Sequence, residues 1–205
     1  MKSNVKNYTD KQLLDKVKSL ENFKKIPKNR WLLGVRSNED AFNTFDDKIY
    51  EFEGEKFIRV VSATTNAGGG YMLGGFSKYN KKGVAVLKSD EWYYNVWSYG
   101  LHRGKMPALR QVGRRVKVYR DGNKDKKIDE VGNWYLGWYG INYHSNTYDF
   151  RLSNLKVFKW LIGGWSAGCQ VVNDREQYKK QMDYYKAAFE KGSQIMVSYC
   201  LIKEF

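Results

Sequence analysis

The chain is poor in cysteine, histidine and proline, and each shortage excludes a class of protein. Among 205 residues there are two Cys, two His and two Pro. Two Cys, Cys169 and Cys200, do not provide the disulfide framework of a small secreted domain. Two His leave little room for the imidazole ligands of a common zinc site, which counts against a zinc peptidase or a zinc deaminase. We therefore expect no metal and no cofactor.

Long apolar runs are also missing. No stretch of about 18 apolar residues occurs, so a membrane-spanning helix is not expected. The first residues, Met1 to Asn7, are polar and show no signal peptide. We expect a protein that stays in the cytoplasm of the producing cell, or that leaves it by another route, such as lysis or packaging in a virus particle. A signal segment trimmed from the chain is the alternative.

What the chain has in abundance is positive charge and aromatic side chains. Lys and Arg number 36 against 22 Asp and Glu, a net charge of +14, and aromatic residues make up 16%. Such a balance favours anionic partners, namely nucleic acid, an anionic envelope polymer or a membrane surface. With 42% hydrophobic residues the chain can bury a core of its own, which excludes a disordered or collagen-like protein.

Two segments have helical patterns. Thr9 and Gln12 form a capping-box pattern, and Pro27 ends the apolar spacing that follows it. This predicts an amphipathic helix over residues 9–25 whose apolar stripe packs on the main body. A second helix is expected after Asn173, with Glu176 as its capping partner and Gly192 as its stop. Its predicted apolar face consists of Tyr178, Met182, Tyr185 and Phe189.

The rest of the chain is strand-like. Turn-forming residues separate the predicted strands, which cover 48–53, 56–65, 83–88, 92–101, 114–120, 134–143, 156–162 and 194–203. The fold class expected is therefore a strand-rich α+β domain with an N-terminal amphipathic helix and one helix near the C-terminus. We divide the chain into an N-terminal helical extension over 1–28 and a single β-rich catalytic-type domain over 29–205.

One constellation of residues carries chemistry. Cys169 follows the small residues Ser166, Ala167 and Gly168, and such a turn can expose a thiol together with backbone N–H groups for an oxyanion. His144 ends a predicted strand upstream and could accept the thiol proton. From the residues alone this pair stands beside a plainer interpretation, because a free Cys is commonly a small buried hydrophobe.

These residues also resemble a family signature. His144-Ser145 followed by Ser166-Ala167-Gly168-Cys169 is similar to the L,D-transpeptidase (YkuD) family pattern of a His, then Ser or Thr, His, Gly and Cys. The resemblance implies a β-sandwich-like catalytic domain with Cys169 as nucleophile and His144 as base. It further implies that Ser145 helps to hold the imidazole and that the amides around Gly168 and Cys169 form an oxyanion hole.

The same resemblance implies a substrate and a reaction. Members of the family cut and rejoin the stem peptides of bacterial peptidoglycan, so a Cys169 thioester resolved by water or by an amine is expected. The chain departs from the family pattern at Ala167, where the family has His, and at Val171, where it has Asn or Arg. These departures indicate a divergent, phage-encoded subgroup. The net charge of +14 would favour approach to anionic wall polymers.

A second histidine segment is predicted to line the substrate cleft. His102 and Arg103 follow a predicted strand in a context like that of His144, and Arg103 could bind stem-peptide carboxylates. Ser166 and Tyr139 complete the predicted substrate-binding set. The alternative is a basic loop with a packed histidine.

Three further segments have plainer interpretations. Asp121 to Glu130 resembles a calcium loop, but Lys126 replaces its turn glycine and Gly132 its bidentate Glu, so a solvated hairpin turn is favoured. Gly68 to Gly75 is a weak phosphate-loop candidate and is better explained as a loop near the site. Aromatic residues between basic ones, as in 92–94 and 134–139, more often fill a core than bind nucleic acid.

Two other functions therefore stay open beside the enzyme. One is a non-enzymatic phage virion or cell-wall-binding protein on the same scaffold. The other is a basic nucleic-acid-binding domain, which we consider the less favoured of the two because the aromatic residues have strand spacing. The oligomeric state is not predicted.

Overall fold

The computed structural model describes residues 4–78, 81–148 and 161–205, and within them it is a strand-rich α+β fold, as the sequence predicts. One group of strands comprises β1 (Arg30–Arg36), β2 (Asp47–Glu53), β3 (Lys56–Thr64), β5 (Glu91–His102), β6 (Met106–Gln111), β9 (Tyr143–Ser145), β10 (Gln170–Val172) and β11 (Val197–Lys203). A second group comprises β4 (Val84–Leu87), β7 (Val116–Asp121) and β8 (Tyr135–Gly137). The helices are α1 (Asp10–Lys18), α2 (Gly69–Met72), the short 3₁₀ helix η1 (Gly75–Lys78) and α3 (Arg175–Glu190).

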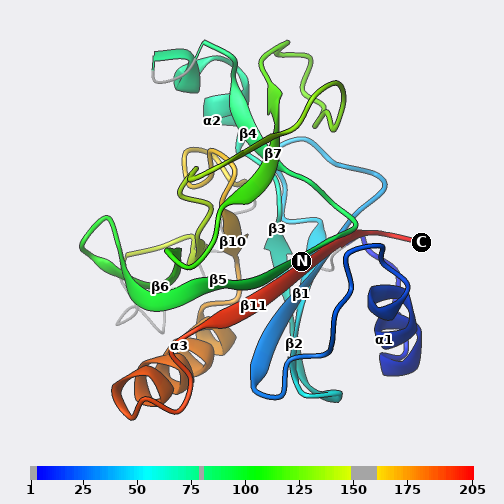
Figure 1. The fold of residues 1–205 in the computed structure, drawn as a ribbon. Helices are drawn as coiled ribbons and strands as arrows, with labels where there is room; N and C mark the ends of the chain where they lie inside the picture. Colours follow the sequence, from blue (N-terminus) through cyan, green and yellow to red (C-terminus); the bar gives the residue numbers. More distant parts are fainter. Residues whose placement is uncertain (1–3, 79–80, 149–160) are drawn as a thin grey trace.

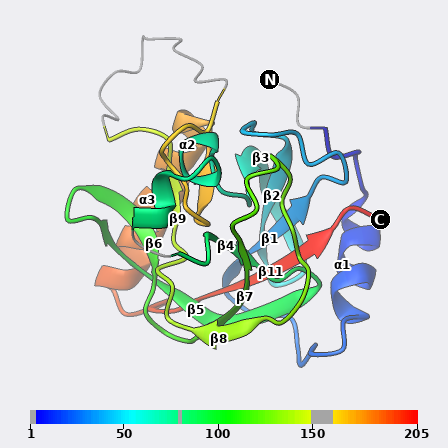
Figure 2. The same ribbon diagram turned by 90° about the horizontal axis from the view of Figure 1, so that it is seen from above.

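The first group of strands closes into a barrel. Its order is β1-β11-β5-β6-β9-β10-β3-β2, and the second group forms a three-stranded sheet ordered β4-β7-β8. Strands β4 and β7 of this sheet are seen above the barrel strands in Figure 1. The family resemblance implies a sandwich-like arrangement, whereas these strands close on themselves. The helices α1 and α3 lie on opposite sides of the barrel (Figure 2).

Strand β1 is a barrel strand that the sequence pattern did not predict. It pairs in parallel with β11 and antiparallel with β2. Every residue from Trp31 to Arg36 is buried, so the polar–apolar alternation of a half-exposed strand is lacking. Gly34 is needed there because a Cβ at its position would lie 2.0 Å from the Tyr199 hydroxyl oxygen.

Helix α1 packs against the barrel through its apolar stripe. Thr9 and Gln12 form the expected capping box, but the helix ends at Lys18, well before residue 25. Its buried residues share one core cluster with strands β1, β2, β5 and β11, and the Trp92 Nε1 donates a hydrogen bond of 2.9 Å to the Val17 carbonyl oxygen.

Helix α3 covers the opposite side. Its N-cap is Asp174, one residue after the predicted Asn173, and the Asp174 side chain accepts a hydrogen bond from the Gln177 amide. Tyr178, Met182 and Tyr185 are buried against the barrel as predicted. Phe189 is 41% exposed, which corrects its assignment to the buried face.

Three other segments differ from their predictions. The predicted strand 134–143 is divided between β8 and β9, which belong to different sheets, and Gly140 between them has a φ of 67°. Residues 106–111, which are not among the predicted strands, form strand β6. The predicted strand 156–162 lies largely outside the described residues; at its end, Leu161 bridges to Thr44.

No helix within the described ranges is long and apolar enough to cross a membrane.

Candidate functional site

The predicted nucleophile and base are carried by neighbouring strands. Strands β9 and β10 pair in parallel, with His144 opposite Val171. Cys169 immediately precedes β10, and the Gln170 amide donates a 2.8 Å hydrogen bond to the Asn142 carbonyl oxygen, which extends the pairing toward the cysteine. Residues opposite each other share a face of the sheet, and Cys169 packs in the same cluster as Val171. The sheet therefore brings the two chain segments together.

The His144 imidazole is held in one tautomer. Its Nδ1 lies 2.8 Å from the Ser145 carbonyl oxygen, and a carbonyl only accepts, so Nδ1 carries the proton. Its Nε2 is buried and has no hydrogen-bond partner among the described residues. Burial, and secondly the charge of the neighbouring His102, lower the pKa of His144 to about 3. At neutral pH His144 thus offers an unprotonated, unengaged Nε2.

The Cys169 thiol is protonated at neutral pH. Its Sγ donates a hydrogen bond of 3.4 Å to the Gly140 carbonyl oxygen. Burial raises the pKa of Cys169 to about 11. A hydrogen bond from the main-chain amide of Asn142 and the positive charge of Arg103 both act to lower it. The pair is therefore a neutral thiol and a neutral imidazole, and a thiolate has to form as the proton leaves.

The turn before Cys169 depends on Gly168. Its φ is 133°, and a Cβ at this position would lie 2.3 Å from the Ala85 carbonyl oxygen. The Gly168 amide donates to the Ser166 hydroxyl at 3.0 Å, and that hydroxyl donates to the Cys169 carbonyl oxygen at 2.8 Å. The buried Ser166 thus stabilises the turn, whereas the sequence predicted that it binds substrate.

Ser145 holds the imidazole through its main chain. The Ser145 carbonyl oxygen accepts from His144, while the Ser145 hydroxyl is buried without a hydrogen-bond partner in the described part of the chain. The expected supporting role thus belongs to the backbone of this residue, and its side chain contributes nothing to it.

His102 and Arg103 lie at this site. The rings of His102 and His144 are stacked, and the Asn142 side-chain amide donates to Nδ1 of His102 at 3.0 Å. Arg103 occupies the turn between β5 and β6 with a φ of 51°. Its positive charge lowers the pKa of both His144 and Cys169, which indicates that the guanidinium is near both groups.

Tyr139 belongs to a different surface. Its ring lies 4.8 Å from the Arg120 guanidinium and packs against Gly137 of β8, both in the three-stranded sheet. The structure therefore brings together His102, Arg103, His144 and Cys169, and it directs the Tyr139 ring to the smaller sheet.

Several residues that support the site were not predicted. Hydrogen bonding with Tyr71 is the main cause that raises the pKa of Arg103, and Tyr148 also hydrogen-bonds to it. The glycine-rich segment, predicted from the sequence as a loop near the site, packs against the turn that precedes the cysteine: the Gly68 amide donates to the Ser166 carbonyl oxygen at 2.8 Å. A Cβ at Gly68 would lie 2.2 Å from the Gly163 carbonyl oxygen. Matching glycines at 68 and 163 were the one available signal of this close approach.

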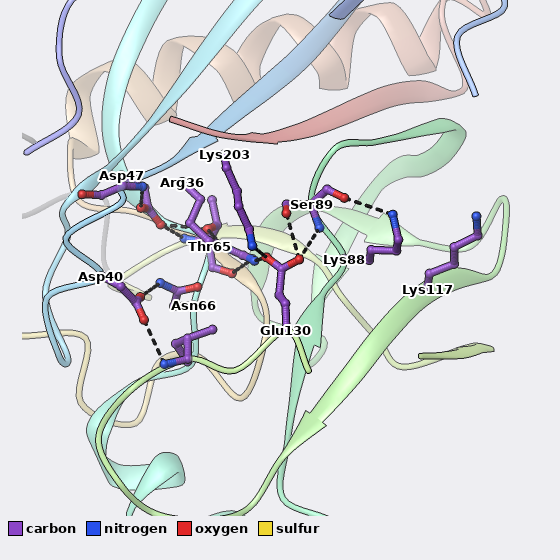
Figure 3. Close-up of polar contacts among 12 residues, drawn as sticks. Arg36, Asp40, Asp47, Thr65, Asn66, Lys88, Ser89, Lys117, Glu130 and Lys203 are labelled. Atoms are coloured by element: carbon purple, nitrogen blue, oxygen red, sulfur yellow. Dashed lines mark hydrogen bonds and ion pairs between the residues drawn. The ribbon is translucent and has the colours of Figure 1, made fainter. Parts of the chain in front are cut away.

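A separate polar cluster joins the barrel to the loop after β7 (Figure 3). Arg36 donates to the Thr65 hydroxyl at 2.9 Å and forms an ion pair with Glu130. The Glu130 carboxylate also accepts from the Ser89 amide at 3.1 Å and hydroxyl at 2.8 Å. The Arg36 charge and the Ser89 hydrogen bonds overcome burial and lower the pKa of Glu130. Because the Arg36, Thr65, Ser89 and Glu130 side chains bond to one another within the protein, we interpret these contacts as structural.

Neither metal nor cofactor ligands are evident at the cysteine site. Within the described ranges, no group of three or more His, Cys, Asp or Glu side chains is arranged as a metal site. The chain matches no known family model, no curated protein and no solved structure.

Proposed function

We propose that this chain is a cysteine-nucleophile enzyme of the L,D-transpeptidase type that acts on peptidoglycan stem peptides. The observation that carries the proposal is the parallel pairing of β9 with β10, which brings the His144 segment beside the Cys169 segment. The unengaged Nε2 of His144 supports a role as base, because the bond from Nδ1 to the Ser145 carbonyl leaves that nitrogen as the acceptor.

The proposed reaction proceeds through a thioester. As the Cys169 sulfur attacks a peptide carbonyl carbon, Nε2 of His144 accepts the thiol proton and a C–S bond forms. The carbonyl oxygen becomes an oxyanion, for which the Cys169 amide is the candidate donor since the Gly168 amide already bonds Ser166. The C–N bond then breaks, and the protonated His144 returns the proton to the departing amine.

The second half of the reaction restores the enzyme. Water or an acceptor amine gives a proton to His144 as it attacks the thioester carbonyl, and the C–S bond breaks. His144 then returns that proton to the sulfur. Water as nucleophile gives a peptidase, and an amine gives a transpeptidase.

Arg103 supports a substrate with a free carboxylate. A guanidinium beside the nucleophile and the base provides a fixed positive charge, which pairs well with a carboxylate. Peptidoglycan stem peptides carry such groups, and the net charge of +14 favours anionic wall polymers in general. A divergent phage enzyme that reaches the wall by lysis or from a virion is consistent with these features.

One observation favours a second candidate, a non-enzymatic wall-binding or virion protein on the same scaffold. Burial keeps the Cys169 thiol protonated, with a pKa raised to about 11, and the thiol therefore lacks the preformed thiolate of many cysteine enzymes. On this alternative, the stacked histidines and the thiol only pack.

Incubation with purified peptidoglycan separates the two candidates. The chain is mixed with walls of several bacterial types, and released or cross-linked muropeptides are identified by mass spectrometry. We expect product from the unchanged chain and from Cys200→Ala, a matched control at the other cysteine, and none from Cys169→Ala or His144→Ala. Wall binding without any product from the correctly folded chain would favour the second candidate.

A further inference from the structure

The loop that follows β7 presents oxygen-bearing groups at alternate positions. Asp121 ends β7, and the groups that follow are the side chains of Asn123, Asp125 and Asp129 and the main-chain carbonyl of Lys127. Carboxylate, amide and carbonyl oxygens at this spacing are the ligands that Ca²⁺ takes from a loop. A sequence pattern alone does not establish a Ca²⁺ site, so the positions of the side chains have to be considered.

Three of these side chains face one another. The Asn123 Nδ2 donates to Asp125 Oδ2 at 3.1 Å and to Asp129 Oδ2 at 2.7 Å. The Asp125 amide in turn donates to Asn123 Oδ1 at 3.1 Å. A partly positive NH₂ group thus lies between two carboxylates, in the position where a cation between them would lie.

The fourth group, Asp121, is buried and incompletely satisfied. Asp121 is 6% exposed, and its Oδ2 has no hydrogen-bond partner among the described residues. The main-chain amides of Asp129 and Asn123 donate hydrogen bonds to the Asp121 carboxylate. Its carboxylate therefore faces the interior of the loop, where an unpaired buried oxygen is costly without a donor or a cation.

Two of the three lysines of the loop, Lys124 and Lys126, point away from this centre. The Lys124 side chain runs along Gly74, where a Cβ would lie 3.2 Å from Lys124 Cε. The Lys126 Nζ lies 5.9 Å from the centre of the Phe42 ring. Both residues have left-handed backbones, with φ of 65° and 71°. The positive charges of these two side chains thus lie outside the centre of the loop.

The C-terminal half of the loop is fixed to the rest of the protein. The Ile128 amide donates to Asp40 Oδ2 at 2.8 Å, and its side chain packs on the cluster of Ala67, Met72, Val84 and Val86. The Glu130 ion pair with Arg36 lies just beyond Asp129. Because Ile128 and Glu130 are anchored, Asp129 is held toward Asp121 before any ion binds.

We propose that this loop binds one Ca²⁺ ion. Its ligands are the carboxylates of Asp121, Asp125 and Asp129, the amide oxygen of Asn123 and the carbonyl oxygen of Lys127, with water completing the shell. In this structure the three carboxylates are not arranged as a metal site, so we expect the loop to close on the ion as it binds, with the Asn123 amide rotating to present its oxygen. Gly132 supplies no bidentate carboxylate, so we expect a dissociation constant on the order of 10⁻⁴ to 10⁻³ M.

Calorimetric titration of the EDTA-treated full chain with CaCl₂ tests the proposal. We expect one site, a higher Tm in Ca²⁺ than in EDTA, and at least tenfold weaker binding for Asp125→Asn. Asp183→Asn is the matched control: it removes one exposed carboxylate on α3, paired with Lys179, and should bind like the unchanged chain.

Asn123→Asp separates a calcium site from a hydrogen-bonded turn. In a calcium site the substitution adds a carboxylate ligand, so binding should tighten. In a hydrogen-bonded turn that does not bind Ca²⁺, Asn123→Asp replaces the bridging amide by a third negative charge, and the variant should not bind Ca²⁺ more tightly. The proposal is overturned if the unchanged chain shows neither Ca²⁺ binding nor a Tm shift. It is also overturned if Asn123→Asp does not bind Ca²⁺ more tightly, or if Asp183→Asn weakens Ca²⁺ binding as much as Asp125→Asn does.

Discussion

The imidazole rings of His102 and His144 are stacked, with centroids 4.3 Å apart and planes inclined by 22°. One histidine thereby controls the charge of the other, because a proton on His102 disfavours a second proton on His144. The stack packs the end of β5, at its hairpin turn with β6, against β9, and it also places the two imidazole charges next to each other.

Substitution of His102 by Phe should raise the pKa of His144. The Phe ring keeps the stacked contact but removes the charge that, after burial, is the next cause of the low pKa of about 3. Burial remains, so the new value should stay below the ordinary 6.5. NMR titration of the imidazole protons measures it directly, since the chain has only two His. An unchanged value would show that His102 has no electrostatic effect on its neighbour.

The low pKa of His144 should make the fold acid-sensitive. The folded value of about 3 lies below the unfolded 6.5, so the unfolded chain binds the proton first. This contribution to the free energy of unfolding is complete above pH 6.5, falls as the pH drops toward 3, and amounts to a loss of about 2 kcal/mol at pH 5. Urea denaturation at pH 7 and pH 5 should show this loss in the unchanged chain and a smaller one in His144→Gln. Equal losses would contradict a buried neutral imidazole.

Alkylation of Cys169 should be slow at neutral pH and should accelerate with pH. A pKa raised from 9.0 to about 11 lowers the thiolate fraction at pH 7 by about 100-fold. Mass spectrometry after iodoacetamide treatment should therefore show a rate that increases about tenfold per pH unit until the pKa is approached. Cys200, fully buried in β11, should react only when the chain unfolds. Rapid labelling of Cys169 at pH 7 would mean that a thiolate forms without substrate.

Gly168→Ala should disturb the cysteine turn more than a comparable change elsewhere. The new Cβ would meet the Ala85 carbonyl oxygen, and the φ of 133° disfavours any side chain. We expect a loss of stability of at least about 1–3 kcal/mol and no muropeptide product. Gly132→Ala is the control, because Gly132 also has a positive φ, 76°, but nothing within 4 Å of its added Cβ. If both variants lose the same stability, the close approach to Ala85 has no energetic weight.

The sequence predicts those parts of the fold in which local chemistry determines the structure. Thr9 with Gln12 determines the start of α1, and alternating apolar residues identify β2, β3 and β5. Strand β6 is not among the predicted strands; it contains Pro107, which pairs with Leu101 at the hairpin end of β5. Whether Pro107 lies in a strand depends on the strand with which it pairs, and a single sequence does not reveal that pairing.

The sequence indicated which residue types form the candidate site, but it did not predict how they are arranged in space. The family resemblance, and not the spacing alone, pointed to Cys169 and His144 as a pair, and β9 and β10 span three residues each, too few to give a periodic pattern. Tyr71 and Tyr148 approach Arg103 from segments far away in sequence, and no local signal relates them. Likewise, Ser166 could not be distinguished from a substrate ligand until its hydroxyl was seen to bridge Gly168 and the Cys169 carbonyl.

The position of β11 bears on how the chain reaches its folded state. This strand is made after all the other described strands, yet it lies between β1 and β5 in the barrel. A chain cut before Val197 would leave the sides of β1 and β5 without hydrogen-bond partners, and open strand edges of this kind promote aggregation. Because β1 and β11 are separated by most of the sequence, we expect folding to be slow, with truncated fragments needing protection by chaperones.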